Sequence, residues 1–235
     1  MPVPLSGVIA LDGPSGTGKS SVARALARRL GARYLDTGAM YRAATLAALR
    51  KGITPDDEPG VLATLAMTTI AVSTDPDDQQ VTIDGVRVGA EIRTPQVTAQ
   101  VSAVSAIAAL RARLVAAQQA LVGDGGIVVE GRDIGTVVAP DAGLKVYLTA
   151  ASHERALRRS RQQGGTSPAD VAETAVAIDR RDAFDSGRLA SPLRPAPDAV
   201  HLDTTTLSLD QVVDRLVELA SARGMLRAPD TASPR

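Results

Sequence analysis

One short glycine-rich stretch, residues 13–20, constrains the fold of this chain more than any other part of its sequence. The run GPSGTGKS has the spacing G-x-x-x-x-G-K-[ST], in which backbone N–H groups converge on a bound polyphosphate. The lysine is expected to contact the β and γ phosphates, and the serine hydroxyl is expected to bind Mg²⁺. The expected nucleotide-binding residues are Gly13, Pro14, Ser15, Gly16, Thr17, Gly18, Lys19, Ser20 and Ser21.

The segments on either side of this loop support the same interpretation. Residues 7–11, GVIAL, are typical of a short parallel strand that is buried on both faces. Residues 20–30 predict a helix, because apolar side chains recur every four positions from Val22 and Gly31 follows as a helix-ending glycine. A glycine-rich turn with a chance lysine would not require this order of elements. The sequence therefore predicts a site for a nucleoside triphosphate and Mg²⁺.

The composition of the 235-residue chain argues against polymer binding. Lys and Arg number 26, as do Asp and Glu, and the aromatic residues are three tyrosines and one phenylalanine. Neither a basic nucleic-acid surface nor a base-stacking platform is predicted. Cysteine is absent, and no charged leader or apolar run of membrane-spanning length occurs. We expect a cytoplasmic monomer that binds small molecules, with no nucleic acid and no membrane as partner.

The pattern of elements predicts an α/β protein with one main core and insertions. A strand at 32–36 and a helix at 38–52 continue the alternation that the phosphate loop begins. Between residues 53 and 93 this alternation stops, and Asp84-Gly85 between alternating apolar residues predicts a β-hairpin. The remaining expected elements are an alanine-rich helical stretch (95–122), two strands (within 126–135 and 144–150), a helix (153–161), paired glycines (164–165), a helix from Ser167, a strand (198–203) and a helix from Ser208.

Six sequence blocks, in order along residues 11–208, resemble those of the cytidylate kinases, a family of nucleoside-monophosphate kinases. The blocks are LDGPSGTGKSS, LDTGAMYR, EIRTPQV, EGRDIGTVV, RRDAFDSGR and PDAVHLDTTTLS. The resemblance implies transfer of the γ-phosphoryl group of ATP to CMP, and also to dCMP, with Mg²⁺ as cofactor and with ADP and CDP as products.

The resemblance also implies a P-loop kinase fold, in which helices flank a parallel sheet that carries a small antiparallel CMP-binding insertion and a helical lid. The implied segments are core with phosphate loop (1–56), CMP-binding insertion (57–104), core (105–152), lid (153–190), core (191–225) and disordered tail (226–235).

Matching the blocks position by position implies a role for each site residue. The implied catalytic residues are Lys19, Arg132, Arg158, Arg159 and Arg188. The implied substrate-binding residues are Arg42, Arg132 and Arg188 around the CMP phosphate, Ser102, Arg111 and Asp133 on cytosine, Arg181 and Asp185 on the ribose, and Thr37 and Tyr41 beside them. Ser20 is the implied Mg²⁺ ligand.

Two of these implied contacts require a break in a predicted helix. Ser102 and Arg111 are nine positions apart, which puts them on opposite faces of a straight helix. Both residues hold one base only if the helical stretch breaks or bends sharply between Ser105 and Ala109.

The implied lid helix carries a second pattern. Arg181, Asp185 and Arg188 lie at i, i+4 and i+7, so one ligand would contact all three. Taken alone, such a triplet is more commonly a solvated ion pair. Phe184 and Gly187 are expected to interrupt this helix. Thr37 and Glu130 stand where the family commonly has serine and aspartate, so a hydroxyl and a carboxylate are kept at these positions.

Three other functions remain open on the sequence. The first alternative is a P-loop kinase for uridylate, adenylate or a non-nucleotide alcohol, and the base-contact residues distinguish these substrates. A regulatory GTPase is disfavoured, because that class commonly reads guanine with Asn-Lys-x-Asp and this chain contains no asparagine. A nucleotide-binding module without catalysis is disfavoured by the intact Lys19, Ser20 and arginine set.

Overall fold

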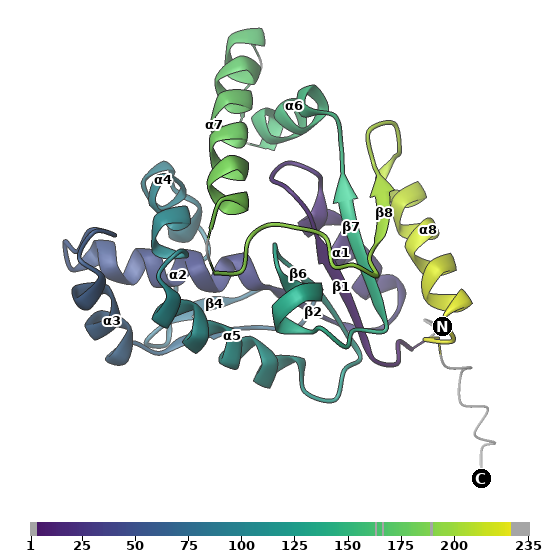
Figure 1. Ribbon diagram of the computed structural model, residues 1–235, viewed down its shortest axis with the longest axis horizontal. Helices are drawn as coiled ribbons and strands as arrows, with labels where there is room; N and C mark the ends of the chain where they lie inside the picture. The colour runs from purple at the N-terminus through teal and green to yellow at the C-terminus, as the bar shows by residue number, and fades with distance from the viewer. Residues whose placement is uncertain (1–3, 163, 166, 189, 227–235) are drawn as a thin grey trace.

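The structure of the protein is a computed structural model, which describes residues 4–162, 164–165, 167–188 and 190–226. Its centre is a parallel sheet in the order β2-β6-β1-β7-β8, flanked by helices (Figure 1). The strands are β1 (Val8–Asp12), β2 (Arg33–Asp36), β6 (Ile127–Glu130), β7 (Leu144–Thr149) and β8 (Val200–Asp203). The predicted α/β fold class is therefore confirmed.

Both faces of the central strands are buried, as their apolar sequences require. On β1, Ile9 and Leu11 pack into one cluster and Ala10 into the other. The first cluster includes Leu26 and Leu216, and the second includes Met40 and Leu110. The helices that carry these last four residues are α1 (Lys19–Arg29), α8 (Leu209–Ala222), α2 (Thr37–Arg50) and α5 (Ala108–Val122).

We expect Leu26→Ala to lower the free energy of unfolding by about 3 kcal/mol, because it leaves a cavity between α1 and the sheet. The Leu26 side chain is fully buried. Leu209, which is 44% exposed on α8, provides a matched control, and Leu209→Ala is expected to cost less than about 1 kcal/mol. Urea unfolding of both variants checks this, and equal costs would contradict the assignment of Leu26 to the core.

The chain between α2 and α5 forms a separate antiparallel unit. Its sheet has the order β3-β4-β5, and its turn at Asp84 and Gly85 has positive φ at both residues, as the sequence predicts for this hairpin. This sheet packs on Ala43 and Leu46 of α2. The elements are α3 (Glu58–Ala66), β3 (Ile70–Val72), β4 (Val81–Ile83), β5 (Val86–Arg87), the 3₁₀ turn η1 (Glu91–Arg93) and α4 (Pro95–Val104).

The predicted break in the alanine-rich helical stretch is confirmed. Helix α4 ends at Val104, α5 begins at Ala108, and the two axes are bent by 101°. The Ser105 hydroxyl donates to the carbonyl oxygen of Ser102 (2.9 Å), and the Arg111 guanidinium donates to that of Ser105 (3.2 Å), so carbonyls freed at the break are paired. Among the described residues no single helix has the length and apolarity to span a bilayer; α4 and α5 meet that criterion only together, across this bend.

Two helices, α6 (Ser152–Gln162) and α7 (Pro168–Ser186), lie beyond the carboxyl ends of the strands (Figure 1). Helix α7 starts after Ser167, as expected; Ser167 and Asp170 form a capping box there, and Pro168 lies in the first turn. The expected interruption of this helix is wrong. Phe184 lies inside the continuous helix, and Gly187 is its C-terminal cap.

The start and end of the described chain meet beside the sheet. Leu5 and Leu226 form a single antiparallel bridge, and Met225 is buried in the cluster beneath α1 and α8. Residue 226 therefore belongs to the folded chain, one position beyond the expected boundary. The rest of the expected disordered tail, residues 227–235, lies outside the described residues.

Candidate active site

Acidic residues gather where three adjacent strands end. Strand β1 ends at Asp12, β2 at Asp36 and β6 at Glu130, and the sheet order makes these strands neighbours. Ligands of open parallel sheets bind at this edge, where the loops that follow the strands meet. A cavity of about 440 Å³ lies here, lined by the phosphate loop, by Asp36 and Glu130, and by residues of α6 and α7.

The phosphate loop connects β1 to α1 and faces this cavity. At Gly13 (φ +145°) a Cβ atom would lie 2.2 Å from the carbonyl oxygen of Leu148, so the close approach of the loop to β7 requires glycine. Thr17 is buried. Six of the nine expected nucleotide-binding residues line the cavity, namely Ser15, Gly16, Gly18, Lys19, Ser20 and Ser21.

The ammonium group of Lys19 is surrounded by oxygen atoms of the loop itself. Its Nζ donates to the carbonyl oxygen of Pro14 (2.6 Å) and to Thr17 Oγ1 (3.3 Å). Burial, and then the neighbouring Arg132 guanidinium, lower the pKa of Lys19. A bound anion would offset both effects, so this lysine is placed to gain an interaction with phosphate.

Glu130 is the centre of a buried group of hydroxyl and carboxylate oxygens. The Ser20 hydroxyl donates to Glu130 Oε2 (3.0 Å), the Tyr34 hydroxyl donates to Oε1, and Thr37 Oγ1 donates to the Glu130 carbonyl oxygen (2.8 Å). Burial raises the pKa of Glu130, and Asp36 lies close enough for its charge to raise it further. Hydroxyl and carboxylate oxygens are the protein ligands that Mg²⁺ prefers, so this donor set fits that ion.

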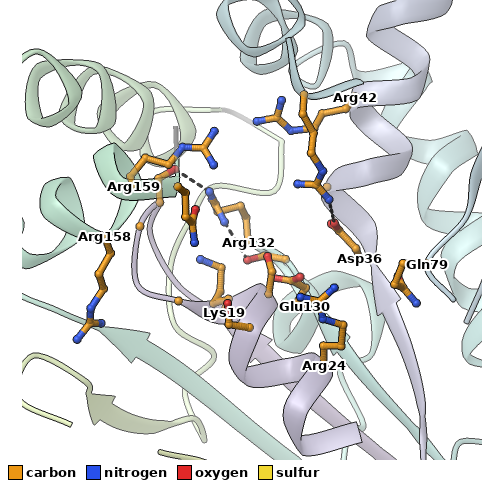
Figure 2. A pocket seen from close by; sticks show the side chains of 18 of the residues that line it. Lys19, Arg24, Asp36, Arg42, Gln79, Glu130, Arg132, Arg158 and Arg159 are labelled. Carbon is orange, nitrogen blue, oxygen red and sulfur yellow. Dashed lines mark hydrogen bonds and ion pairs between the residues drawn. The ribbon is translucent and has the colours of Figure 1, made fainter. Parts of the chain in front are cut away.

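Arginine dominates the remaining wall of the cavity. Figure 2 shows Lys19, Arg132 and Arg159 on one side of it and Arg42 with Asp36 on another. The lining arginines are Arg24, Arg42, Arg93, Arg132, Arg158, Arg159 and Arg181. Among the described residues, Asp36 and Glu130 are the only carboxylates that line the cavity, so these side chains give it an excess of positive charge that suits a polyphosphate.

Two of the three arginines expected around an acceptor phosphate line this cavity. Arg42 donates to the carbonyl oxygen of Ile92 (3.1 Å) and to Thr98 Oγ1 (2.8 Å), and burial lowers its pKa to about 9. Arg132 donates from Nη2 to Ser15 Oγ (2.8 Å). These contacts hold each guanidinium in place before any ligand arrives, which reduces the entropy cost of binding.

Arg188, the third of these arginines, is not among the residues that line the cavity. It lies two residues beyond the end of α7, and its Nε donates to the carbonyl oxygen of Asp185 (3.2 Å). Its Nη1 donates to Ser105 Oγ (3.3 Å) at the break between α4 and α5. The structure therefore places Arg188 against the helix break.

A buried ion pair lies beside the break between α4 and α5. Arg111 on α5 pairs with Asp133, and both side chains are almost fully buried. The Arg111 guanidinium also lies over the ring of Tyr41, 5.1 Å from its centroid. The structure thus joins two of the three residues expected on the base, and it places Tyr41 in contact with Arg111.

Asp185 connects the expected ribose and phosphate residues. Its carboxylate lies 3.3 Å from Arg132 Nε, 3.6 Å from Arg188 Nη2 and 3.9 Å from Arg181 Nε. The prediction that Arg181, Asp185 and Arg188 share one helix face holds for Arg181 and Asp185 only, because Arg188 lies beyond the end of α7, but all three side chains meet at Asp185. The Asp185 side chain is 3% exposed, so this is not the solvated ion pair of the commoner alternative.

The two expected arginines of α6 point in different directions. Arg158 donates to Thr204 Oγ1 (3.0 Å) and to the carbonyl oxygens of Thr204 (2.6 Å) and Thr205 (3.2 Å), and Figure 2 shows it directed away from Lys19. Arg159 lines the same cavity, and burial lowers its pKa. In this conformation Arg159 is the better placed of the two for a transferred phosphoryl group.

Comparison with known proteins assigns the family. The cytidylate kinase family model matches residues 9–222. The chain belongs to the cytidylate kinase family. A cytidylate kinase of Rhodococcus opacus is 54% identical over 218 residues, which cover 92% of this chain and 95% of that protein. One of Nocardia farcinica is 53% identical, over 89% and 91% of the two chains, and one of Mycobacterium avium is 52% identical, over 92% and 96%.

Among solved structures, a shikimate kinase from Acinetobacter baumannii in complex with shikimate shares 16% identity with this member of the cytidylate kinase family. The TM-score is 0.45, and the alignment covers 92% of this chain and 94% of that one.

Several residues at the site of this cytidylate kinase family member were not predicted from its sequence. Asp12, which is 4% exposed, accepts hydrogen bonds from the amides of Ile134 and Gly135 (both 2.8 Å), where a π-helical turn, η2 (Ile134–Val138), follows Asp133. Its position at the end of a predicted strand was a signal that could have found it. Asp182 and Arg155 contact the phosphate loop from α7 and α6. No local pattern marks such long-range contacts.

The buried carboxyls of the site predict how stability changes with pH. Burial, and then the Asp36 charge, raise the pKa of Glu130 to about 7, and burial raises that of Asp12 to about 6. Both carboxyls ionise near pH 4 when unfolded, so the folded state holds protons that the unfolded state has released between about pH 4 and 7. We therefore expect the free energy of unfolding to fall as the pH rises through this window.

Glu130→Gln tests the larger of these two contributions, because glutamine has no proton to lose. In urea unfolding without nucleotide, the decrease in unfolding free energy between about pH 5 and 7.5 should be smaller in the variant by on the order of 2 kcal/mol. Asp141→Asn, at an exposed position, is the control and should keep the wild-type slope. An unchanged slope in Glu130→Gln would contradict the raised pKa.

Proposed function

We propose that this chain transfers the γ-phosphoryl group of ATP to CMP, and also to dCMP, giving ADP and CDP. The observation that carries the proposal is an arginine-lined cavity that has the phosphate loop at one side and Arg42 and Arg132 in its wall. Arg132 pairs with Asp185 and directly precedes Asp133, which forms a buried pair with Arg111. A donor site for polyphosphate and a polar acceptor site are thereby set side by side, as transfer between two bound nucleotides requires.

On the donor side, the phosphate loop and Lys19 hold the phosphates of ATP. Ser20, with the carboxylates of Glu130 and Asp36 behind it, would hold Mg²⁺. When bound, this ion supplies neutralisation of charge on the phosphate oxygens. Lys19 and Arg159, with Arg158 after reorientation, stabilise the charge that the transferred group develops on its equatorial oxygens.

On the acceptor side, Arg42 and Arg132 hold the phosphate of CMP, and Arg188 supports them through Asp185. The acceptor oxygen belongs to a phosphate that is already largely ionised near neutral pH, because the second pKa of a phosphate monoester is about 6. No strong general base is therefore needed, and the work of the protein is alignment and charge stabilisation.

Selection of cytosine rests on hydrogen-bond polarity. The exocyclic amine of cytosine is a donor that suits the Asp133 carboxylate, and its N3 and O2 atoms are acceptors that suit Arg111 and Ser102. Uracil presents O4 and N3–H at the corresponding positions, which would leave buried polar groups unpaired. The pair of Arg111 with Asp133 fixes the direction of both groups before the base arrives.

The proposed roles of the chain segments follow from this arrangement of the two nucleotide sites. Residues 57–104 form the CMP-binding insertion, and residues 153–190 form a lid that closes over the phosphates and keeps water from the transferred group. The remaining core segments, 1–56, 105–152 and 191–225, hold the two nucleotides in line. We further propose that the protein works as a cytoplasmic monomer.

An ADP-release assay against CMP, dCMP, UMP, AMP and GMP, with ATP and Mg²⁺, tests this function. We expect CMP to give the highest kcat/KM, exceeding UMP by at least about tenfold. A higher kcat/KM for AMP or GMP would favour another nucleoside-monophosphate kinase. Absence of ADP release with every acceptor, together with tight ATP binding, would favour the non-catalytic nucleotide-binding module.

A further inference from the structure

The phosphate loop of this structure already has a carboxylate bound to one of its amides. The backbone N–H of Ser15 donates to Asp182 Oδ1 at 2.9 Å, and Asp182 lies on α7, 167 positions away in the sequence. Ser15 is the third residue of the eight-residue phosphate-loop motif and lines the cavity. Because the amides of such loops bind phosphate oxygens, an anionic side chain here occupies a ligand position.

A second set of contacts fixes this carboxylate in place. Arg155 on α6 donates from Nη1 to Asp182 Oδ2 and to the carbonyl oxygen of Ser15 (3.0 Å). Helix α6 is packed closely on the loop, since a Cβ atom at Gly16 would lie 2.7 Å from the Arg155 carbonyl oxygen. Ser15, Asp182 and Arg155 therefore close a ring that ties both helices to the loop.

The charge of Asp182 acts on the Lys19 ammonium, which is also the group that a nucleotide phosphate would contact. The Asp182 carboxylate lies near enough to the Lys19 ammonium for its charge to favour the protonated lysine. A β or γ phosphate seeks both this ammonium and the loop amides. A phosphate oxygen and the Asp182 carboxylate would both be attracted to the loop amide and the Lys19 ammonium, and their negative charges would repel each other at this position.

We propose that Asp182 is a positioning residue that occupies the donor-phosphate site of the empty enzyme and that the phosphates of ATP displace it. This inference rests on the proposed donor site. Displacement frees Arg155 from its carboxylate partner beside the loop. Asp182 also lies on α7 between Arg181 and Asp185, which pair with each other and are the residues proposed to hold the ribose of the acceptor, so its release couples ATP binding to a change in α7.

Binding of a nonhydrolysable ATP analogue, AMP-PNP with Mg²⁺ and without CMP, tests this by titration calorimetry. Asp182→Asn keeps an acceptor for the Ser15 amide but removes the charge and the ion pair with Arg155. We expect its Kd to be at least about fivefold lower than that of the wild type, because a charge-assisted competitor has been removed. Asp182→Ala should also bind more tightly, and it serves if the asparagine variant fails to fold.

The control is Asp179→Asn. Asp179 also pairs with Arg155, at 3.5 Å, but its side chain is 62% exposed, and this ion pair joins it to α6 rather than to the loop. We expect its Kd to stay within about twofold of the wild type. General loosening of the lid by loss of an Arg155 partner would change the Kd of the Asp179 and Asp182 variants alike. The proposal predicts a changed Kd only in the Asp182 variants.

The outcomes separate this inference from the proposed function. Failure of the wild type to bind AMP-PNP would overturn the donor site itself. Binding by the wild type with an equal or higher Kd in both Asp182 variants would overturn only the role of Asp182. Tighter binding in those variants supports the proposal, and a damaged fold would weaken binding instead.

Discussion

Replacing Lys19 with alanine is expected to lower kcat at least about 100-fold, which corresponds to about 2.7 kcal/mol of transition-state stabilisation. Within the described residues, the Lys19 ammonium donates hydrogen bonds to oxygens of the phosphate loop alone, so its removal takes away charge at the site rather than packing in the core. Because burial already lowers the pKa of Lys19, the charged side chain is not a source of stability. We expect the free energy of unfolding of Lys19→Ala to equal or exceed that of the wild type.

Steady-state ADP release with CMP and ATP, together with urea unfolding, measures both parts of this prediction. Lys51→Ala is the matched control, because Lys51 is exposed at the end of α2, and it should keep wild-type kcat. A loss of less than about tenfold in Lys19→Ala would show that this loop does not serve the transferred phosphate.

Asp133→Ala is expected to affect both specificity and stability. Removing the proposed acceptor for the cytosine amine should lower kcat/KM for CMP at least about tenfold and reduce the preference of the enzyme for CMP over UMP. The structure adds a second effect, because Arg111 would be left charged and almost fully buried without its partner. That loss typically lowers the free energy of unfolding by about 3 kcal/mol.

A double variant separates the two effects. Arg111→Met with Asp133→Ala removes both buried charges, so its free energy of unfolding should return toward that of the wild type. Its preference for CMP over UMP should remain smaller than that of the wild type, because the double variant lacks both Arg111 and Asp133, the groups proposed to read the base. If the Asp133→Ala variant kept the full CMP preference, this carboxylate would not be the residue that reads the base.

Local sequence patterns predicted the parts of the site that depend on near neighbours. The phosphate loop follows from glycine spacing within residues 13–20, and the hairpin turn follows from Asp84-Gly85. The bend between α4 and α5 followed from a conflict, since one base cannot contact Ser102 and Arg111 on a straight helix. The first two predictions rest on the geometry of a single segment, whereas the third combines helix geometry with two base contacts that the family resemblance implies.

Contacts between distant segments were beyond such patterns. Nothing near Asp182 in the sequence points to Ser15, because their contact depends on how α7 packs over the phosphate loop. The direction of Arg158, toward Thr204, depends in the same way on where β8 places the following loop. Side-chain direction on α6 is set by packing, so the sequence predicted two equivalent arginines where the structure has two different ones.

The break between α4 and α5 has a consequence for redesign of this enzyme. The Ser105 carbonyl accepts from Arg111, and the Ser105 hydroxyl accepts from Arg188, so one residue contacts both the pair proposed to read the base and the chain that follows α7. Changing the accepted base by altering Arg111 alone would therefore disturb the anchoring of α7. We expect that new acceptor specificities will require the loop 105–107 to be redesigned together with the residues that face the base.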